Sequence, residues 1–296
     1  MAIAANGQAV AAAYEDGCVR VWDLRRRRVR PELRAEGLQP SCVLFTADGR
    51  LVVGGEGGVA IAGDKLAALG PVVRPIDAPV SALAERPDGR ILVGGERGPY
   101  ASLVALVAAW DPRTGASSDT PSPGGGGAAS SPDGRWIATW NWRQTRIHDA
   151  ADSGAPPREL TLPNGNGGVD EIYQVEFSPG GDLVATGTAG FHLALWDTAT
   201  WEVRRIINLN GDSVCAMAFS PDGRTLAVAT SYASEVELRD VATGARVGIL
   251  DAHTDNARAV AFSPDGATVV TGAADGTLRL WDPRNARLRA TLPPPS

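Results

Sequence analysis

The sequence has little of what disulfide frameworks, zinc sites and membrane spans require. Its three cysteines, Cys18, Cys42 and Cys215, are widely spaced and form no Cys-x-x-Cys pair, which indicates neither a disulfide framework nor a zinc site. No apolar run approaches the roughly 18 residues that a membrane helix needs. The first ten residues contain no basic side chain and resemble a signal peptide poorly. We therefore expect a cytoplasmic protein that contacts no membrane.

Catalytic motifs and basic charge are scarce as well. The chain has three histidines and no HExxH, GxSxG, P-loop or dinucleotide-binding motif. No cluster of metal ligands is visible. The formal net charge of −6 argues against nucleic-acid binding. We predict a protein that is not an enzyme, holds no cofactor or metal, and binds no nucleic acid.

Turns, in contrast, are abundant, and one kind recurs. A turn centred on Asp-Gly, or a close variant, separates two apolar stretches every 40 to 47 residues. Such dipeptides favour the tight turns that join antiparallel strands. The seven copies are Asn6-Gly7, Asp48-Gly49, Asp88-Gly89, Asp133-Gly134, Gly180-Gly181, Asp222-Gly223 and Asp265-Gly266.

A second marker follows each turn and gives the same count of seven. It is an alternating stretch that ends in Trp-Asp, at Trp22, Trp110, Trp196 and Trp281, or in an Asp alone, at Asp64, Asp149 and Asp240. In the last unit, short apolar stretches at 260–262, 268–271, 278–281 and 288–292 predict four strands. One sheet of this size cannot bury both of its faces, so the units must stack.

With these two markers the chain resembles the WD-repeat family of β-propellers, best in the unit RAVAFSPDGATVVTGAADGTLRLWD at 258–282. The resemblance covers nearly the whole chain. It implies an all-β fold, a seven-bladed β-propeller of four-stranded antiparallel blades. The chain would form one domain, 1–296, with blades near 1–35, 36–76, 77–120, 121–165, 166–209, 210–252 and 253–296.

The resemblance also implies a buried hydrogen-bonded tetrad in the last blade, formed by His253, Thr271, Asp275 and Trp281. The other blades lack the full set, so we expect packing to hold them together. Neither end of the chain offers a strand to complete the opposite blade. We expect either a domain cut from a longer chain or a ring closed only by packing between blades 1 and 7.

In the family, the loops between second and third strands and those between successive blades share the top face. Several of these loops carry aromatic residues or arginine, the types enriched at binding hot spots. We predict a partner-binding surface there, although packing against neighbouring blades explains any one of these residues equally well. The surface would comprise Tyr14, Arg97, Tyr100, Trp140, Trp142, Arg143, Phe191, His192 and Tyr232.

A run of arginines follows the third strand of blade 1, and blade 7 carries more at the corresponding place. We favour a solvated edge that deters strand pairing, with docking of an acidic partner or phosphate as the alternative. This basic bottom-rim patch comprises Arg25, Arg26, Arg27, Arg28, Arg284 and Arg287.

The predicted function is that of a non-catalytic scaffold whose top-face loops bind a peptide, a protein or another domain of the same polypeptide. A stiff ring holds these loops in place, so little entropy is lost on binding. Two alternatives stay open: a ligand-sensing or regulatory module of a larger signalling or defence protein, and a propeller enzyme of the hydrolase or lyase kind.

Overall fold

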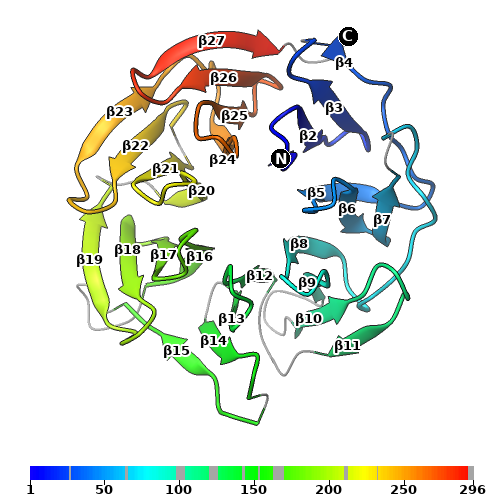
Figure 1. The fold of residues 1–296 in the computed structure, drawn as a ribbon, viewed down its shortest axis with the longest axis horizontal. Helices are drawn as coiled ribbons and strands as arrows, with labels where there is room; N and C mark the ends of the chain where they lie inside the picture. The colour runs from blue at the N-terminus through cyan, green and yellow to red at the C-terminus, as the bar shows by residue number, and fades with distance from the viewer. Residues whose placement is uncertain are drawn as a thin grey trace. The chain divides into compact units, whose positions relative to one another are not determined.

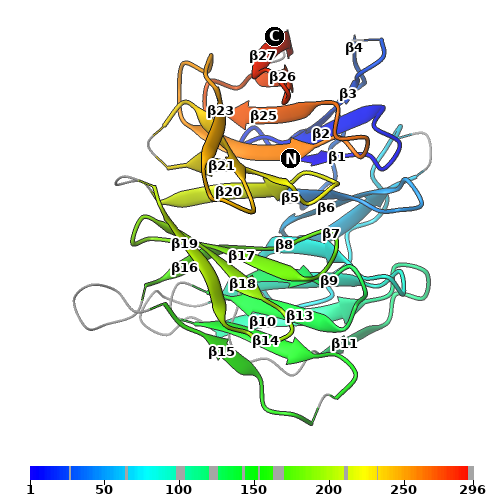
Figure 2. The ribbon, with the colours of Figure 1, turned by 60° about the vertical axis from the view of Figure 1, so that its left-hand side comes forward.

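The computed structural model describes residues 1–26, 28–63, 66–97, 104–119, 126–141, 144–152, 154–162, 170–209, 213–231 and 233–292. Within these ranges no helix forms, and hence none that could cross a membrane. The chain divides into two compact units, Met1–Leu160 and Thr161–Ser296. Both consist of antiparallel sheets, which we number as blades 1 to 7 in chain order (Figure 1, Figure 2).

Unit 1 contains blades 1 to 4, each built from strands that follow one another along the chain. Blade 1 comprises β1 (Ala2–Ile3), β2 (Ala9–Ala13), β3 (Val19–Asp23) and β4 (Arg28–Val29). Blade 2 comprises β5 (Gln39–Phe45), β6 (Leu51–Glu56) and β7 (Gly58–Ala62). Blade 3 comprises β8 (Val80–Glu85), β9 (Ile91–Arg97), β10 (Val104–Trp110) and β11 (Ser117–Asp119). Blade 4 comprises β12 (Gly127–Ser130), β13 (Trp136–Trp140), β14 (Thr145–Asp149) and β15 (Arg158–Leu160).

Unit 2 contains blades 5 to 7, built in the same way. Blade 5 comprises β16 (Ile172–Phe177), β17 (Leu183–Thr188), β18 (His192–Asp197) and β19 (Val203–Asn208). Blade 6 comprises β20 (Val214–Phe219), β21 (Thr225–Thr230), β22 (Val236–Asp240) and β23 (Arg246–Leu250). Blade 7 comprises β24 (Ala257–Phe262), β25 (Val269–Ala273), β26 (Leu278–Asp282) and β27 (Arg287–Leu292). The first strand of blade 6, β20, lies next to the first strands of blades 5 and 7, β16 and β24.

The predicted fold class, an all-β, seven-bladed β-propeller, is confirmed. One detail differs, because blade 2 has three regular strands rather than four. Two isolated bridges, Val59↔Val73 and Ala62↔Leu69, lie where the fourth strand would be. Pro71 falls between these bridges, and a proline has no N–H to donate to a strand ladder.

The recurring Asp-Gly turns have the geometry that the sequence predicts. All seven second residues are glycines in the left-handed region, with φ between 66° and 87°. In a turn such as that of Asp265-Gly266, the aspartate accepts a hydrogen bond from the backbone N–H two residues later, at 2.9 Å from Ala267. Ser263 donates to the same carboxylate at 2.6 Å. Turn chemistry therefore accounts for these aspartates.

Within each unit, apolar side chains between successive blades form the core. Trp22 and Trp281 are among the largest fully buried side chains. In blade 7, the indole N–H of Trp281 donates to Thr271 Oγ1 at 2.9 Å. Trp22 pairs with Val10, and Ala12, two residues further along, occupies the position that corresponds to Thr271. Trp22 Nε1 is buried and has no hydrogen-bond partner within the described structure.

This unpaired donor predicts a stabilising substitution. Ala12→Thr would place a hydroxyl where Trp22 Nε1 can donate to it, and we expect the free energy of unfolding to rise by about 1 kcal/mol. Ala12→Val has the same shape without the acceptor and serves as the control. Chemical denaturation of both variants measures the difference, and equal stabilities of the two would contradict the assignment.

Candidate functional site

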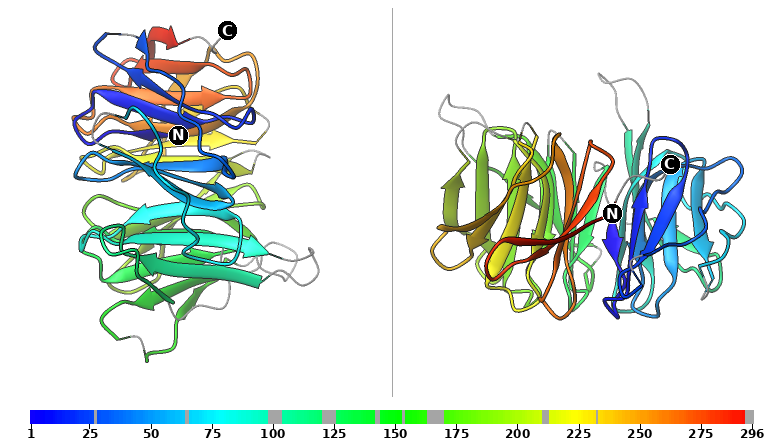
Figure 3. Two further views of the ribbon diagram at one scale, coloured as in Figure 1. Left: turned by 90° about the vertical axis from the view of Figure 1, so that its right-hand side faces the viewer. Right: turned by 90° about the horizontal axis from the view of Figure 1, so that it is seen from above.

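Each blade has two ends, seen edge-on in the right-hand view of Figure 3. We call top the end where the first strand begins and the loop between second and third strands lies. The bottom end carries the Asp-Gly turns and the turns after the third strands.

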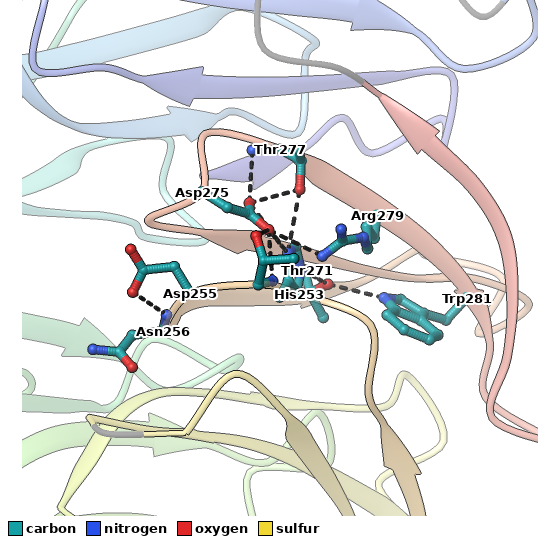
Figure 4. A network of polar contacts seen from close by, with 9 residues as sticks. His253, Asp255, Asn256, Thr271, Asp275, Thr277, Arg279 and Trp281 are labelled. Carbon is teal, nitrogen blue, oxygen red and sulfur yellow. Dashed lines mark hydrogen bonds and ion pairs between the residues drawn. The ribbon is translucent and has the colours of Figure 1, made fainter.

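Blade 7 carries a chain of four buried polar side chains (Figure 4). Thr271 Oγ1 accepts the indole N–H of Trp281 at 2.9 Å and lies 2.7 Å from His253 Nε2. On the other side of the ring, His253 Nδ1 is 3.1 Å from Asp275 Oδ2. The carboxylate favours a proton on Nδ1, so Thr271 donates to Nε2. The structure thus brings together all four residues of the tetrad that the family resemblance implies.

Burial and hydrogen bonding set the charges of this network. Burial lowers the pKa of His253, which keeps its ring neutral at neutral pH. Burial acts to raise the pKa of Asp275, but hydrogen bonds from Thr277, the backbone N–H of Thr254 and His253 outweigh it and hold this pKa below its usual range. Arg279 pairs with the same carboxylate at 3.1 Å. The network therefore contains an ionised carboxylate, Asp275, that is paired with Arg279 and hydrogen-bonded to a neutral His253.

Parts of the same network occur in two other blades. In blade 5, Trp196 Nε1 donates to Thr186 Oγ1 at 2.9 Å. In blade 4, His148 stands in the place of the tryptophan and its Nε2 lies 3.2 Å from Thr139 Oγ1. We expected that packing alone holds the blades other than blade 7 together. This expectation was too strict, because blades 4 and 5 each keep one buried hydrogen bond that corresponds to a bond of the tetrad.

Blade 1 replaces the tetrad with an ion cluster. The buried Arg20 guanidinium lies 2.5 Å from Asp16 and 2.8 Å from Glu32. It also lies over the ring of Tyr14, at 4.6 Å from the centroid, and Tyr14 packs against Trp22 at 6.1 Å. Tyr14, one of the residues of the predicted partner-binding surface, is therefore half-buried and packed within its own blade.

Two further residues of that predicted surface also contact their own unit. Arg97, at the end of β9, forms an ion pair with Asp77. Trp140, at the end of β13, lies over Gly127 of the neighbouring strand, and a Cβ on this glycine would come within 2.1 Å of the indole. Both residues are at the top end, but only half of the Arg97 side chain is exposed, and Trp140 is half-buried.

Phe191 and His192 are at the top end of blade 5. His192 Nδ1 lies 2.9 Å from the buried Asp170. The Phe191 side chain has no such contact with a charged group and is 42% exposed. Its φ of 68° is in the left-handed region, which is unusual for a bulky residue.

Tyr173 is a candidate residue that the sequence analysis missed. Five of the first strands carry one extra residue in a β-bulge, at Ser41, Ser81, Tyr173, Cys215 and Arg258. The small ones donate to a carbonyl of the next blade, as Ser41 does to Val80 at 2.6 Å. In blade 5, Gln174 makes this bond instead, to Cys215 O at 3.0 Å. Tyr173 is left 40% exposed. The signal that could have found it is an aromatic residue at a position that holds Ser or Cys in three of the other four blades.

The arginines of the predicted bottom-rim patch lie on two separate turns. Arg25, Arg26 and Arg28 are exposed around the turn between β3 and β4. In unit 2, Arg284 and Arg287 are exposed beside the turn between β26 and β27, and Arg284 Nε lies 3.3 Å from Asp282. Exposed side chains of this kind agree with a solvated edge, which stays a prediction, as does docking of an acidic partner or phosphate.

Several predicted residues lie outside the described residues: Tyr100, Trp142, Arg143 and Tyr232 of the partner-binding surface, and Arg27 of the bottom-rim patch. Within the part of the chain that the structure describes, no three His, Cys, Asp or Glu side chains gather as a metal site would require. Burial raises the pKa of the thiols of Cys18 and Cys42 to about 11, so both are protonated at neutral pH.

Comparisons with known proteins agree with this architecture. The family model described as "WD domain, G-beta repeat" matches residues 1–23 and 244–282. The model "Anaphase-promoting complex subunit 4 WD40 domain" matches residues 175–256. Among curated proteins, none matches the sequence significantly.

Two solved structures are similar over most of the chain. A chain in the crystal structure of a mitotic checkpoint complex is 23% identical with a TM-score of 0.77, and the match covers 95% of this chain and 85% of that one. The β-propeller domain of Cps50 (Swd1) from Myceliophteria thermophila is 18% identical with a TM-score of 0.72, and 87% of each chain is covered. At these identities the likeness concerns the fold alone.

Proposed function

Because the chain belongs to the WD-repeat family of β-propellers, we propose that it is a binding module that recognises a protein or peptide through the top ends of its blades. Sheets of this kind hold their loops at fixed positions, which limits the entropy lost on binding. A structural neighbour that is part of a mitotic checkpoint complex supports a role in protein interactions.

The conformation of Phe191 is the observation that carries this proposal. It occupies the position five residues before the tryptophan of the third strand. At that position blades 1 and 7 have Gly17 and Gly276, with φ of 81° and 76°. Glycine adopts this conformation freely, whereas a phenylalanine there costs on the order of 1 kcal/mol. Since Phe191 is also 42% exposed, packing within the blade leaves part of its ring uncovered, and contact with a partner would account for a phenylalanine at this place.

The only other exposed aromatic side chain within the described structure is Tyr173. It lies at the top end of the same blade. The backbone N–H of Ala189 donates to Glu171 O at 2.8 Å and joins the two antiparallel segments that carry Phe191 and Tyr173, with Tyr173 on the innermost strand and Phe191 in the loop between β17 and β18. Aromatic side chains are enriched at the centres of protein interfaces, and this end of blade 5 exposes two of them.

A peptide selected against the wild-type protein from a random display library tests the proposal. We expect Phe191→Gly to weaken its affinity at least tenfold, because an aromatic hot spot contributes about 2 kcal/mol. The same variant should be at least as stable as wild type, since glycine relieves the backbone strain. Fluorescence anisotropy and thermal unfolding measure the two effects.

Val247→Ser is the matched control. Val247 is 62% exposed on the outer strand β23, away from the top loops. The selected peptide should bind this variant as it binds wild type. Unchanged affinity of Phe191→Gly, or an equal loss in Val247→Ser, would place the binding surface elsewhere.

A further inference from the structure

The top end of unit 2 carries mostly negative charge. The described carboxylates at this end are Asp170, Glu171, Glu235, Asp251, Asp255 and Asp275, and the guanidinium groups are Arg258 and Arg279. Two of the carboxylates are engaged within the fold, Asp170 with His192 and Asp275 with His253 and Arg279. The others leave an excess of negative charge at the end that also carries the two exposed aromatic rings.

One carboxylate lies directly beside an aromatic ring. The hydroxyl of Tyr173 donates to Glu171 Oε2 at 3.1 Å. Glu171 immediately precedes β16 and Tyr173 is the bulge residue of that strand, and this hydrogen bond holds the two side chains together. A carboxylate next to a phenol ring offers a cation both an ion pair and the face of an aromatic ring.

Charge decides which partner suits this end of blade 5. An acidic segment would be repelled by Glu171 and its neighbours, and a purely apolar segment would leave this carboxylate without a counter-charge as it is desolvated. A lysine or arginine side chain is not repelled by these carboxylates and supplies the counter-charge that Glu171 needs when it is desolvated. Its charge pairs with the carboxylate, and its alkyl stem covers the apolar surface of the Tyr173 ring.

We propose that the top end of blade 5 binds a segment of a protein partner through an arginine or lysine side chain. The cation is held by Glu171 and by the face of the Tyr173 ring. This inference rests on the proposed binding function and specifies the chemistry of the partner at that site.

Three display libraries that differ only in one fixed central residue, Arg, Leu or Glu, test the inference on the full chain. We expect the Arg library to be enriched at least tenfold over the other two on the wild-type protein. Binding of an enriched Arg peptide should weaken at least fivefold in Glu171→Gln, which keeps an acceptor for the Tyr173 hydroxyl but loses the charge. Glu202→Gln serves as the control, because Glu202 is an exposed carboxylate of the same blade next to the bottom turn.

The outcomes separate this inference from the function on which it rests. Enrichment of the Leu library with binding lost in Phe191→Gly would overturn the cation specificity and leave the binding function standing. Enrichment of none of the libraries would overturn both. An equal loss in Glu171→Gln and Glu202→Gln would show a diffuse effect of net charge and would also overturn the site.

Discussion

Asp275→Ala should lower the free energy of unfolding by about 3 to 5 kcal/mol, because it leaves two buried groups without their partner. The Arg279 side chain is 10% exposed and the His253 side chain is fully buried, and both contact this carboxylate at 3.1 Å. Removing the carboxylate also leaves the backbone N–H groups of Thr254 and Thr277 without their acceptor. Urea denaturation measures the loss.

Asp16→Ala is the matched control for this substitution. Asp16 holds the equivalent turn position in blade 1, where it pairs with Arg20, four residues later, as Asp275 pairs with Arg279. Its side chain is 45% exposed, and Arg20 keeps Glu32 as a second partner at 2.8 Å. We expect a loss of about 1 kcal/mol or less. Comparable losses in the two variants would refute the buried network as the main source of the effect.

Glu176→Gln should make the stability of unit 2 less dependent on pH. Glu176 lies on β16, and burial raises the pKa of its carboxyl from 4.5 to about 7. Because the folded state binds this proton more tightly than the unfolded state does, its contribution to stability is complete below about pH 4.5. That contribution is lost as the pH rises through about 7, where the partly buried carboxylate becomes charged.

The glutamine variant lacks this titration and should gain relative to wild type as the pH rises. One pKa unit is equivalent to about 1.4 kcal/mol, so we expect Glu176→Gln to be more stable than wild type by on the order of 2 to 3 kcal/mol at pH 8, and similar to it at pH 4. Unfolding free energies measured from pH 4 to 8 provide the comparison, with Glu202→Gln as the exposed control. A constant difference between Glu176→Gln and wild type at every pH would contradict the assignment.

The blade architecture could be predicted from the sequence because it depends on local chemistry. Turns such as Asp265-Gly266 need a glycine at positive φ and an aspartate that caps the backbone, and both requirements are visible in the residues themselves. The four residues of the tetrad were implied by the family resemblance, and all four belong to one repeat. Their contacts therefore follow once the strands pair in register.

The exposure of individual aromatic residues could not be predicted in this way, because it depends on neighbours that are distant in the sequence. Trp140 is half-buried since Gly127 leaves room for its ring. Tyr173 is exposed since Gln174 makes the contact with the next blade that the bulge residue makes elsewhere. The irregular edge of blade 2 depends on where Pro71 falls relative to the ladder.

Hydrogen exchange of the wild-type protein, with and without a peptide selected against it, tests the central claim most directly. Recognition at the top end of blade 5 predicts slower exchange of the amides at 170–174 and 188–192, with the outer strand β23 at 246–250 unchanged. Slower exchange confined to β23, or to the bottom turns such as 265–267, would contradict the claim.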